Sequence, residues 1–255
     1  MYEEILPEEV EDNKRFNIFK IIFYYIIIGF VGWSFFSFIF TFFWFDIKEI
    51  NIEGNYYTSN ETIIKQGRLD KHINLFLFDV EASGLDILKN PWIADVYIKK
   101  RPPNRLSVKI IERKPEVLLY NNEVFYLISE EGVILSASGQ SDNEHGLYIV
   151  TGLDIKNNIP GEKIDIEKYN YIKRIIYALN NIFPEQFYKI QVISNEEYLL
   201  FHKKAQIKVR IKDGDQLIDE WYLLERAIQN VIQENTPIKE INMKYEDRLS
   251  IILEE

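Results

Sequence analysis

Residues of the types that catalyse reactions or bind metals are few in this chain and scattered. Its three histidines, His72, His145 and His202, lie far apart, and none has a carboxylate or a second histidine at metal-ligand spacing. The glutamate pairs at 130–131 and 196–197 would direct their carboxylates apart in a strand or turn, so neither pair suits acid–base catalysis. The chain has no cysteine and no nucleotide-binding, serine-hydrolase or zinc-protease motif. We therefore expect no enzyme activity, no cofactor, no metal and no small-molecule substrate.

Positive charge is concentrated in one short stretch, which contains Lys99, Lys100, Arg101 and Arg105. The simplest interpretation is a solvated face of a β-sheet. The alternative is a contact surface for an acidic partner or for lipid head groups. Because the formal net charge of the whole chain is −10, neither a general nucleic-acid binder nor a general binder of anionic lipids is expected.

An apolar segment near the N-terminus determines where these side chains can act. Residues 21–45 contain no ionisable side chain except tyrosine. At about 1.5 Å per residue, a helix of this length crosses a hydrocarbon core of roughly 30 Å. Because Lys14, Arg15 and Lys20 precede the segment, the positive-inside rule predicts a cytoplasmic tail at 1–20 and an extracytoplasmic bulk. We expect a single-pass type II protein of the cell membrane; a cleaved signal peptide would have a shorter apolar region and a small-residue cleavage site.

The pattern of residues 46–115 predicts a small α+β domain. Alternating apolar residues indicate strands at 47–53, 93–100 and 106–112, the last two joined by a turn at 101–104. Helices are expected at 61–66 and at 80–89, the second capped by Asp79. The order is β-α-α-β-β, with two helices on one face of a three-stranded sheet.

Residues 116–255 are richer in predicted strands and form a second α+β domain. Two helices are expected there: one from Ile166 to Leu179, and one that buries Leu217, Trp221 and Leu224, with Asp215 as its cap. Residues 238–245 and 249–253 should form a hairpin at one edge of the sheet, around Glu246 and Asp247. The other strands are expected at 116–120, 124–128, 133–135, 146–152, 188–193, 198–202 and 206–211.

The segment PWIADVYIKKRPPNRLSVKIIERKP, at 91–115, resembles a strand-turn-strand motif of the FtsQ/DivIB cell-division family. FYLISEEGVIL at 125–135 and YIVTGLDIKNNIPGEKI at 148–164 resemble two further motifs of that family, although the proline expected before Val150 is absent. Near the C-terminus, the stretch from Asn242 to Tyr245 keeps only the tyrosine of the family's Asp-Leu-Arg-Tyr pattern.

This resemblance implies a cytoplasmic tail (1–20), a transmembrane helix (21–45), a POTRA domain (46–115) and a β-domain with an open sheet edge (116–255). It implies a non-enzymatic divisome scaffold at the division septum, which binds small coiled-coil proteins of the FtsL and FtsB/DivIC types by strand addition. Together these proteins would control the septal peptidoglycan synthase. The residues implied in partner binding are Lys244, Tyr245, Leu249, Ser250, Ile251, Ile252 and Leu253. The alternatives are a membrane-tethered extracytoplasmic enzyme that modifies peptidoglycan and a POTRA module for polypeptide transport.

Overall fold

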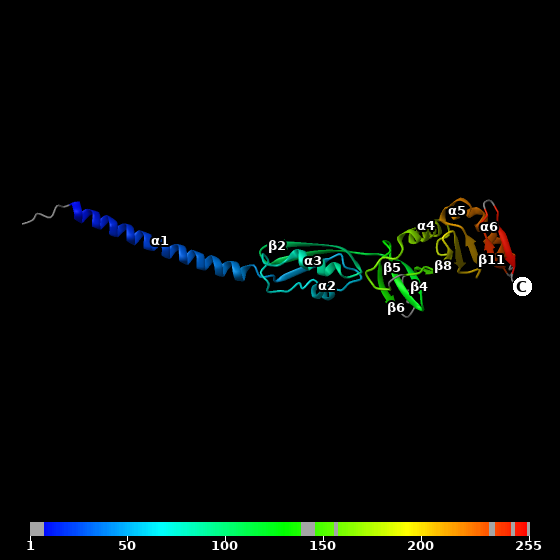
Figure 1. Ribbon diagram of the computed structural model, residues 1–255, viewed down its shortest axis with the longest axis horizontal. Helices are drawn as coiled ribbons and strands as arrows, with labels where there is room; N and C mark the ends of the chain where they lie inside the picture. Colours follow the sequence, from blue (N-terminus) through cyan, green and yellow to red (C-terminus); the bar gives the residue numbers. More distant parts are fainter. Residues whose placement is uncertain (1–7, 139–145, 156–157, 235–237, 246–247, 254–255) are drawn as a thin grey trace, which may run out of the picture. The chain divides into compact units, whose positions relative to one another are not determined.

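The computed structural model describes residues 8–138, 146–155, 158–234, 238–245 and 248–253. Its first element is a long helix, α1 (Glu8–Trp44), drawn in blue in Figure 1. Within it, Ile18–Phe38 is long and apolar enough to cross a membrane, by length and composition. The side chains of this segment are exposed, as expected of a helix whose solvent is lipid. The predicted apolar helix is therefore part of a longer one.

The chain divides into two compact units that interleave in sequence. The first holds Met1–Glu53, Asn60–Gly84 and Tyr97–Lys109, and the second holds Gly54–Ser59, Leu85–Val96 and Ile110–Glu255. The predicted domain limits after residues 20, 45 and 115 remain predictions.

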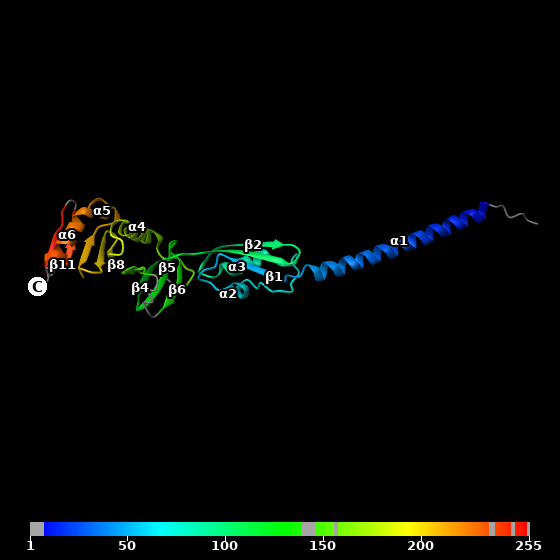
Figure 2. The same ribbon diagram turned by 180° about the vertical axis from the view of Figure 1, so that it is seen from behind.

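A three-stranded sheet, visible with its two helices in Figure 2, follows α1. Its strands are β1 (Glu49–Glu53), β2 (Ile93–Arg101) and β3 (Arg105–Glu112), in the order β1-β3-β2, with β1 parallel to β3. Between β1 and β2 come α2 (Asn60–Gln66) and α3 (Val80–Leu88). Asp79 caps α3, because its Oδ1 accepts a hydrogen bond from Ala82 N at 3.0 Å. The element order β-α-α-β-β is the predicted one.

A nine-stranded sheet contains all the remaining strands. Its order is β12-β11-β10-β9-β8-β7-β4-β5-β6, so β12 and β6 are its edges. The pairs β4–β7, β7–β8 and β10–β11 are parallel. The strands are β4 (Pro115–Asn121), β5 (Val124–Ser129), β6 (Ile134–Ser138), β7 (Tyr148–Thr151), β8 (Phe187–Ser194), β9 (Glu197–His202), β10 (Lys208–Ile211), β11 (Ile238–Asn242) and β12 (Ser250–Leu253).

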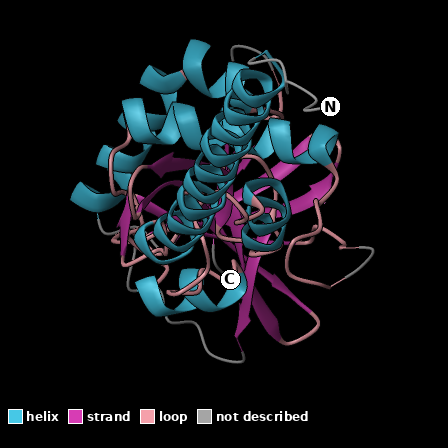
Figure 3. Ribbon diagram, turned by 90° about the vertical axis from the view of Figure 1, so that its left-hand side faces the viewer, coloured by secondary structure: helices cyan, strands magenta, loops and turns pink. Residues whose placement is uncertain are grey.

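Helices provide the crossovers that two of these parallel pairs require. Helix α4 (Ile166–Ile182) connects β7 to β8, and α5 (Gly214–Asp219) and α6 (Trp221–Glu234) connect β10 to β11; Figure 3 distinguishes helices from strands by colour. The core of this sheet includes Ile172 and Leu179 of α4 and Leu200 of β9, each fully buried. The mixed α+β class is thus confirmed.

One predicted core residue is wrong. Trp221 is 42% exposed, whereas Leu217 and Leu224 are fully buried. The predicted single helix is two helices, since α5 ends at Asp219 and α6 begins at Trp221. A break in the helix changes the angular register of the residues after it, so the tryptophan leaves the buried face. The cap also differs: Asp213, not Asp215, accepts from Gln216 N at 2.8 Å.

Candidate functional site

Strand β12 is an edge strand with apolar side chains. It pairs antiparallel with β11, with Ile251 opposite Ile241 and Ser250 opposite Asn242, and it is the terminal strand of the sheet as described. Ile251 and Ile252 are each 46% exposed and Leu253 is 59% exposed. Because successive side chains of a strand point to opposite faces, apolar surface is exposed on both faces of this edge. An edge of this kind is a template for another strand.

The predicted binding residues lie in three different environments. Ser250, Ile251, Ile252 and Leu253 form β12, and Leu249, just before it, packs partly buried against the core of the nine-stranded sheet. Tyr245 is 65% exposed in the loop after β11. Lys244, in the same loop, is already engaged: its Nζ lies 3.1 Å from Glu197 Oε2.

The structure places a charged network beside this edge that the sequence analysis missed. Arg210 of β10 donates to Glu197 of β9 and to Glu240 of β11, with Nη2 3.0 Å from Glu240 Oε2. Its hydrogen bonds, first to Glu240 and then to Glu197, hold the pKa of Arg210 above its ordinary value. Hydrogen bonds from Lys244 and then Arg210 hold the pKa of Glu197 below its ordinary value. A bidentate arginine between two carboxylates fixes the mutual position of three adjacent strands.

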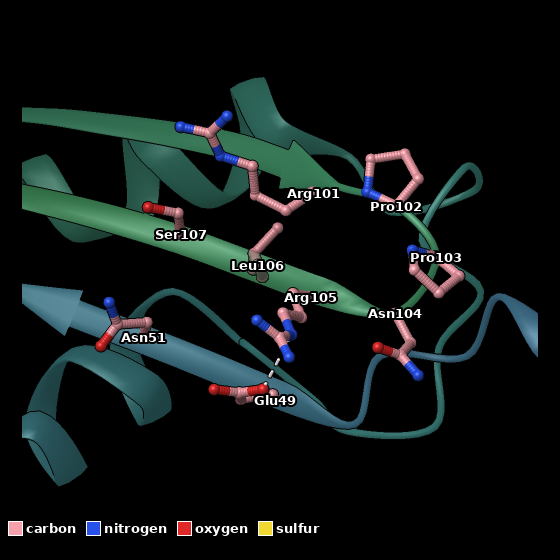
Figure 4. A pocket seen from close by; sticks show the side chains of 9 residues that line it. All are labelled: Glu49, Asn51, Arg101, Pro102, Pro103, Asn104, Arg105, Leu106 and Ser107. Atoms are coloured by element: carbon pink, nitrogen blue, oxygen red, sulfur yellow. Dashed lines mark ion pairs between the residues drawn. The ribbon is translucent and has the colours of Figure 1, made fainter.

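The four predicted surface cations do not share one face. Arg101 and Arg105 line a pocket of about 490 Å³ with Glu49 on the sheet face turned away from the helices (Figure 4). There Arg105 Nε forms an ion pair with Glu49 Oε2 at 3.0 Å. Lys99, like Arg101, is exposed and alternates with Lys100 along β2. Lys100 Nζ instead donates to the backbone oxygen of Phe76, at 3.1 Å.

Of the two histidines that the structure describes, one is buried and hydrogen-bonded and the other is exposed to solvent. His202 is 3% exposed, and its Nδ1 accepts from the backbone of Lys204 at 3.2 Å and of Ala205 at 2.9 Å. Burial lowers the pKa of His202, which favours this neutral, accepting form. His72 is exposed, and His145 lies outside the described residues. Among the residues that the structure describes, no three histidine, aspartate or glutamate side chains are grouped so that they could hold a metal ion.

Comparison with known families identifies the class of the first domain. Residues 45–113 match the family model of the POTRA domain, FtsQ-type, and this match covers the three-stranded sheet with α2 and α3.

The individual relatives are cell-division proteins. Over 146 residues the chain is 27% identical to cell division protein DivIB of Clostridium acetobutylicum, a match covering 54% of this chain and 57% of that protein. DivIB of Clostridium tetani is 26% identical over 68% of this chain and 66% of its own length. FtsQ of Rickettsia typhi is 29% identical over 42% of this chain and 40% of its own length.

The matches therefore span 40 to 66% of these relatives' lengths. The predicted resemblance to the FtsQ/DivIB cell-division proteins is confirmed. A solved extracytoplasmic domain of DivIB from Geobacillus stearothermophilus aligns at 13% identity with a TM-score of 0.31, over 49% of this chain and 97% of that domain.

Proposed function

We propose that this protein is a non-enzymatic, membrane-anchored scaffold of the bacterial divisome, and that it binds a partner by strand addition to β12. The observation that carries the proposal is the exposed apolar edge formed by Ile251, Ile252 and Leu253. The names of the relatives, cell division proteins DivIB and FtsQ, supply the cellular process.

Strand addition explains why this edge is apolar. A partner strand would satisfy the outward N–H and C=O groups of β12 and cover its side chains on both faces. The network of Arg210, Glu197 and Glu240 would keep the neighbouring strands in place, so the edge needs little ordering on binding. Tyr245 is available for a side-chain contact, while Leu249 secures the start of β12.

On this proposal the partners are the small coiled-coil division proteins of the FtsL and FtsB/DivIC types. The assembly would regulate the septal peptidoglycan synthase at the division septum, with residues 1–20 in the cytoplasm. No observation on the described residues favours the alternative of a peptidoglycan-modifying enzyme.

The edge is tested with proline. Backbone groups of successive residues in an antiparallel edge strand point alternately to the neighbouring strand and outward. Of the two variants Ile251→Pro and Ile252→Pro, one therefore removes an N–H that points outward to the partner, and the other removes an N–H that points to β11. We expect each to weaken co-purification of the full chain with its coiled-coil partner by more than about tenfold.

The matched control is Ile251→Thr, which keeps the N–H and the β-branched shape and should retain most of the binding. Circular dichroism melting shows whether each variant remains folded. Binding that withstands both prolines in folded protein would exclude β12 as the site.

The cellular role is tested independently of β12. A fluorescent protein fused to the N-terminus should concentrate at midcell, and depletion of the protein should produce filaments without septa. Uniform peripheral fluorescence with normal septation would contradict the division role, whatever the proline variants show.

A further inference from the structure

A turn of the first unit holds two large apolar side chains out into solvent. Leu75 and Phe78 are 0% and 6% exposed, but Phe76 and Leu77 between them are 56% and 76% exposed. Asn74 fixes the turn: its Oδ1 accepts from Phe76 N, and its backbone oxygen accepts from Leu77 N and Phe78 N, all at 3.0 Å. The two buried residues anchor the turn, so the exposure of the other two is built into its geometry.

This turn lies directly beside the end of α1. Leu75 N donates to the backbone oxygen of Phe45 at 2.7 Å, and Ile47 N donates to Ile73 O at 2.9 Å. The rings of Phe45 and Phe76 meet edge to face, with their centroids 4.9 Å apart. Since Phe45 follows α1 immediately, the exposed apolar residues are held where the chain leaves the helix.

The end of α1 is at the level of the lipid head groups if the apolar segment 21–45 crosses the membrane. At about 1.5 Å per residue this segment extends about 37 Å, whereas the hydrocarbon core is roughly 30 Å thick. The head-group region on each side of a bilayer is roughly 5 to 8 Å thick. Phe45 and the turn beside it are therefore at the surface of the membrane.

Three lysines lie on the segments that hold the turn in place. Lys48 and Lys71 are exposed next to the backbone bonds that join Ile47 to the turn, and Lys100 Nζ donates to Phe76 O. Of the nearby acids, Glu49 is paired with Arg105 and Asp79 caps α3, which leaves Asp46 and Asp70. An apolar tip flanked by lysines is the pattern of a segment that binds the interface of an anionic membrane.

We propose that the turn at 73–78 docks on the membrane that α1 spans. Phe76 and Leu77 insert among the head groups, and Lys48, Lys71 and Lys100 pair with the phosphates of anionic lipids. This contact would hold the first unit against the bilayer, and it is independent of the strand addition proposed for β12.

The absence of cysteine makes the test direct, because one introduced cysteine labels one position. The full chain carrying Leu77→Cys is labelled with an environment-sensitive nitrobenzoxadiazole dye and reconstituted into vesicles that contain a lipid-attached quencher. Glu53→Cys is the matched control, since it is exposed at the other end of β1, about 13 Å from Glu49. We expect quenching at 77 to exceed that at 53 by roughly twofold or more.

Charge is tested by vesicle composition and by substitution. Adding phosphatidylglycerol to phosphatidylcholine vesicles should increase quenching at 77. Lys48→Ala with Lys71→Ala should lower the ratio of docked to undocked turn by about fivefold per lysine. Lys65→Ala with Lys109→Ala makes the same charge change at other exposed positions and should have little effect.

Equal quenching at 77 and 53 would overturn the proposal. The proposal would also be overturned if the fluorescence of the dye at residue 77 changed only when another membrane protein was added and not in lipid vesicles alone. The turn would then be a protein interface.

Discussion

At the scale of single residues, two adjacent glutamates differ in role: one belongs to the ion-pair network beside β12, and the other is exposed to solvent. Glu197 accepts from both Arg210 and Lys244, while its neighbour Glu196 is exposed. The sequence predicted only that the carboxylates at 196–197 point apart, and the pairing of β10 with β9 and β11 is what brings Arg210 to one of them. The amino-acid types were visible in the sequence, but their partners depend on contacts between strands far apart in it.

The network predicts a pH dependence of stability. The pKa of Glu197 is lowered in the folded protein, so its contribution is fully present above its unfolded pKa, near 4.5, and is lost as pH falls through the lower folded pKa. Glu197→Gln should reduce the free energy of unfolding at neutral pH by about 1 kcal/mol. The variant should also lose less stability than the native protein below pH 4.5. Thermal melting at a series of pH values measures both effects.

Glu196→Gln is the matched control, and we expect melting curves close to those of the native protein at every pH. Equal pH dependence in the native protein and Glu197→Gln would show that the network contributes nothing to stability.

At the scale of elements, local pattern predicted the strands well, but it predicted which strands are neighbours only where a hairpin joins them, as in β4–β5 and β11–β12. Hairpins such as β4–β5 follow from a short turn between alternating segments. The parallel pairs β4–β7 and β10–β11 join segments separated by other strands or by helices, and periodicity carries no information on that choice. The prediction that Trp221 is buried was wrong for a related reason. The apolar spacing of three and four residues continues in the sequence across a break between α5 and α6.

Gly152, directly after β7, is a position that tolerates no side chain. Its φ is +82°, and an added Cβ would lie 2.2 Å from the backbone oxygen of Val192 in β8. Gly152→Ala should therefore cost about 3 kcal/mol or more, from the positive φ and from forcing β8 away. Chemical denaturation measures the loss.

Gly146 supplies the control, because its φ is also positive, +63°, but an added Cβ would have no neighbour within 4 Å among the residues that the structure describes. Gly146→Ala should cost only about 1 kcal/mol. If the two variants were equally stable, the close approach of β7 and β8 would not be the cause.

At the scale of the whole molecule, the apolar segment and the POTRA motif could both be predicted because each is a continuous stretch of sequence. The apolar turn at 73–78 was not predicted. Its sequence, Asn-Leu-Phe-Leu-Phe after Ile73, ends in a run of four apolar residues that periodicity alone would assign to a buried segment. The exposure of Phe76 and Leu77 depends on a turn held by Asn74. The hydrogen bond from Leu75 N to Phe45 O and the contact of the Phe45 and Phe76 rings connect that turn to the end of α1, and neither can be read from the sequence.

This connection predicts that the length of α1 controls membrane docking. Inserting about seven polar, helix-forming residues after Trp44, where α1 ends, adds two turns, or roughly 10 Å, and nearly preserves the direction in which the first unit faces. Phe76 and Leu77 would then be lifted beyond the head groups. Quenching of the dye at residue 77 should fall to the level measured at residue 53. Co-purification through β12 should be unchanged, because the insertion alters neither its backbone nor its neighbours in the sheet. Undiminished quenching in the lengthened chain would mean that α1 does not set the height of the turn.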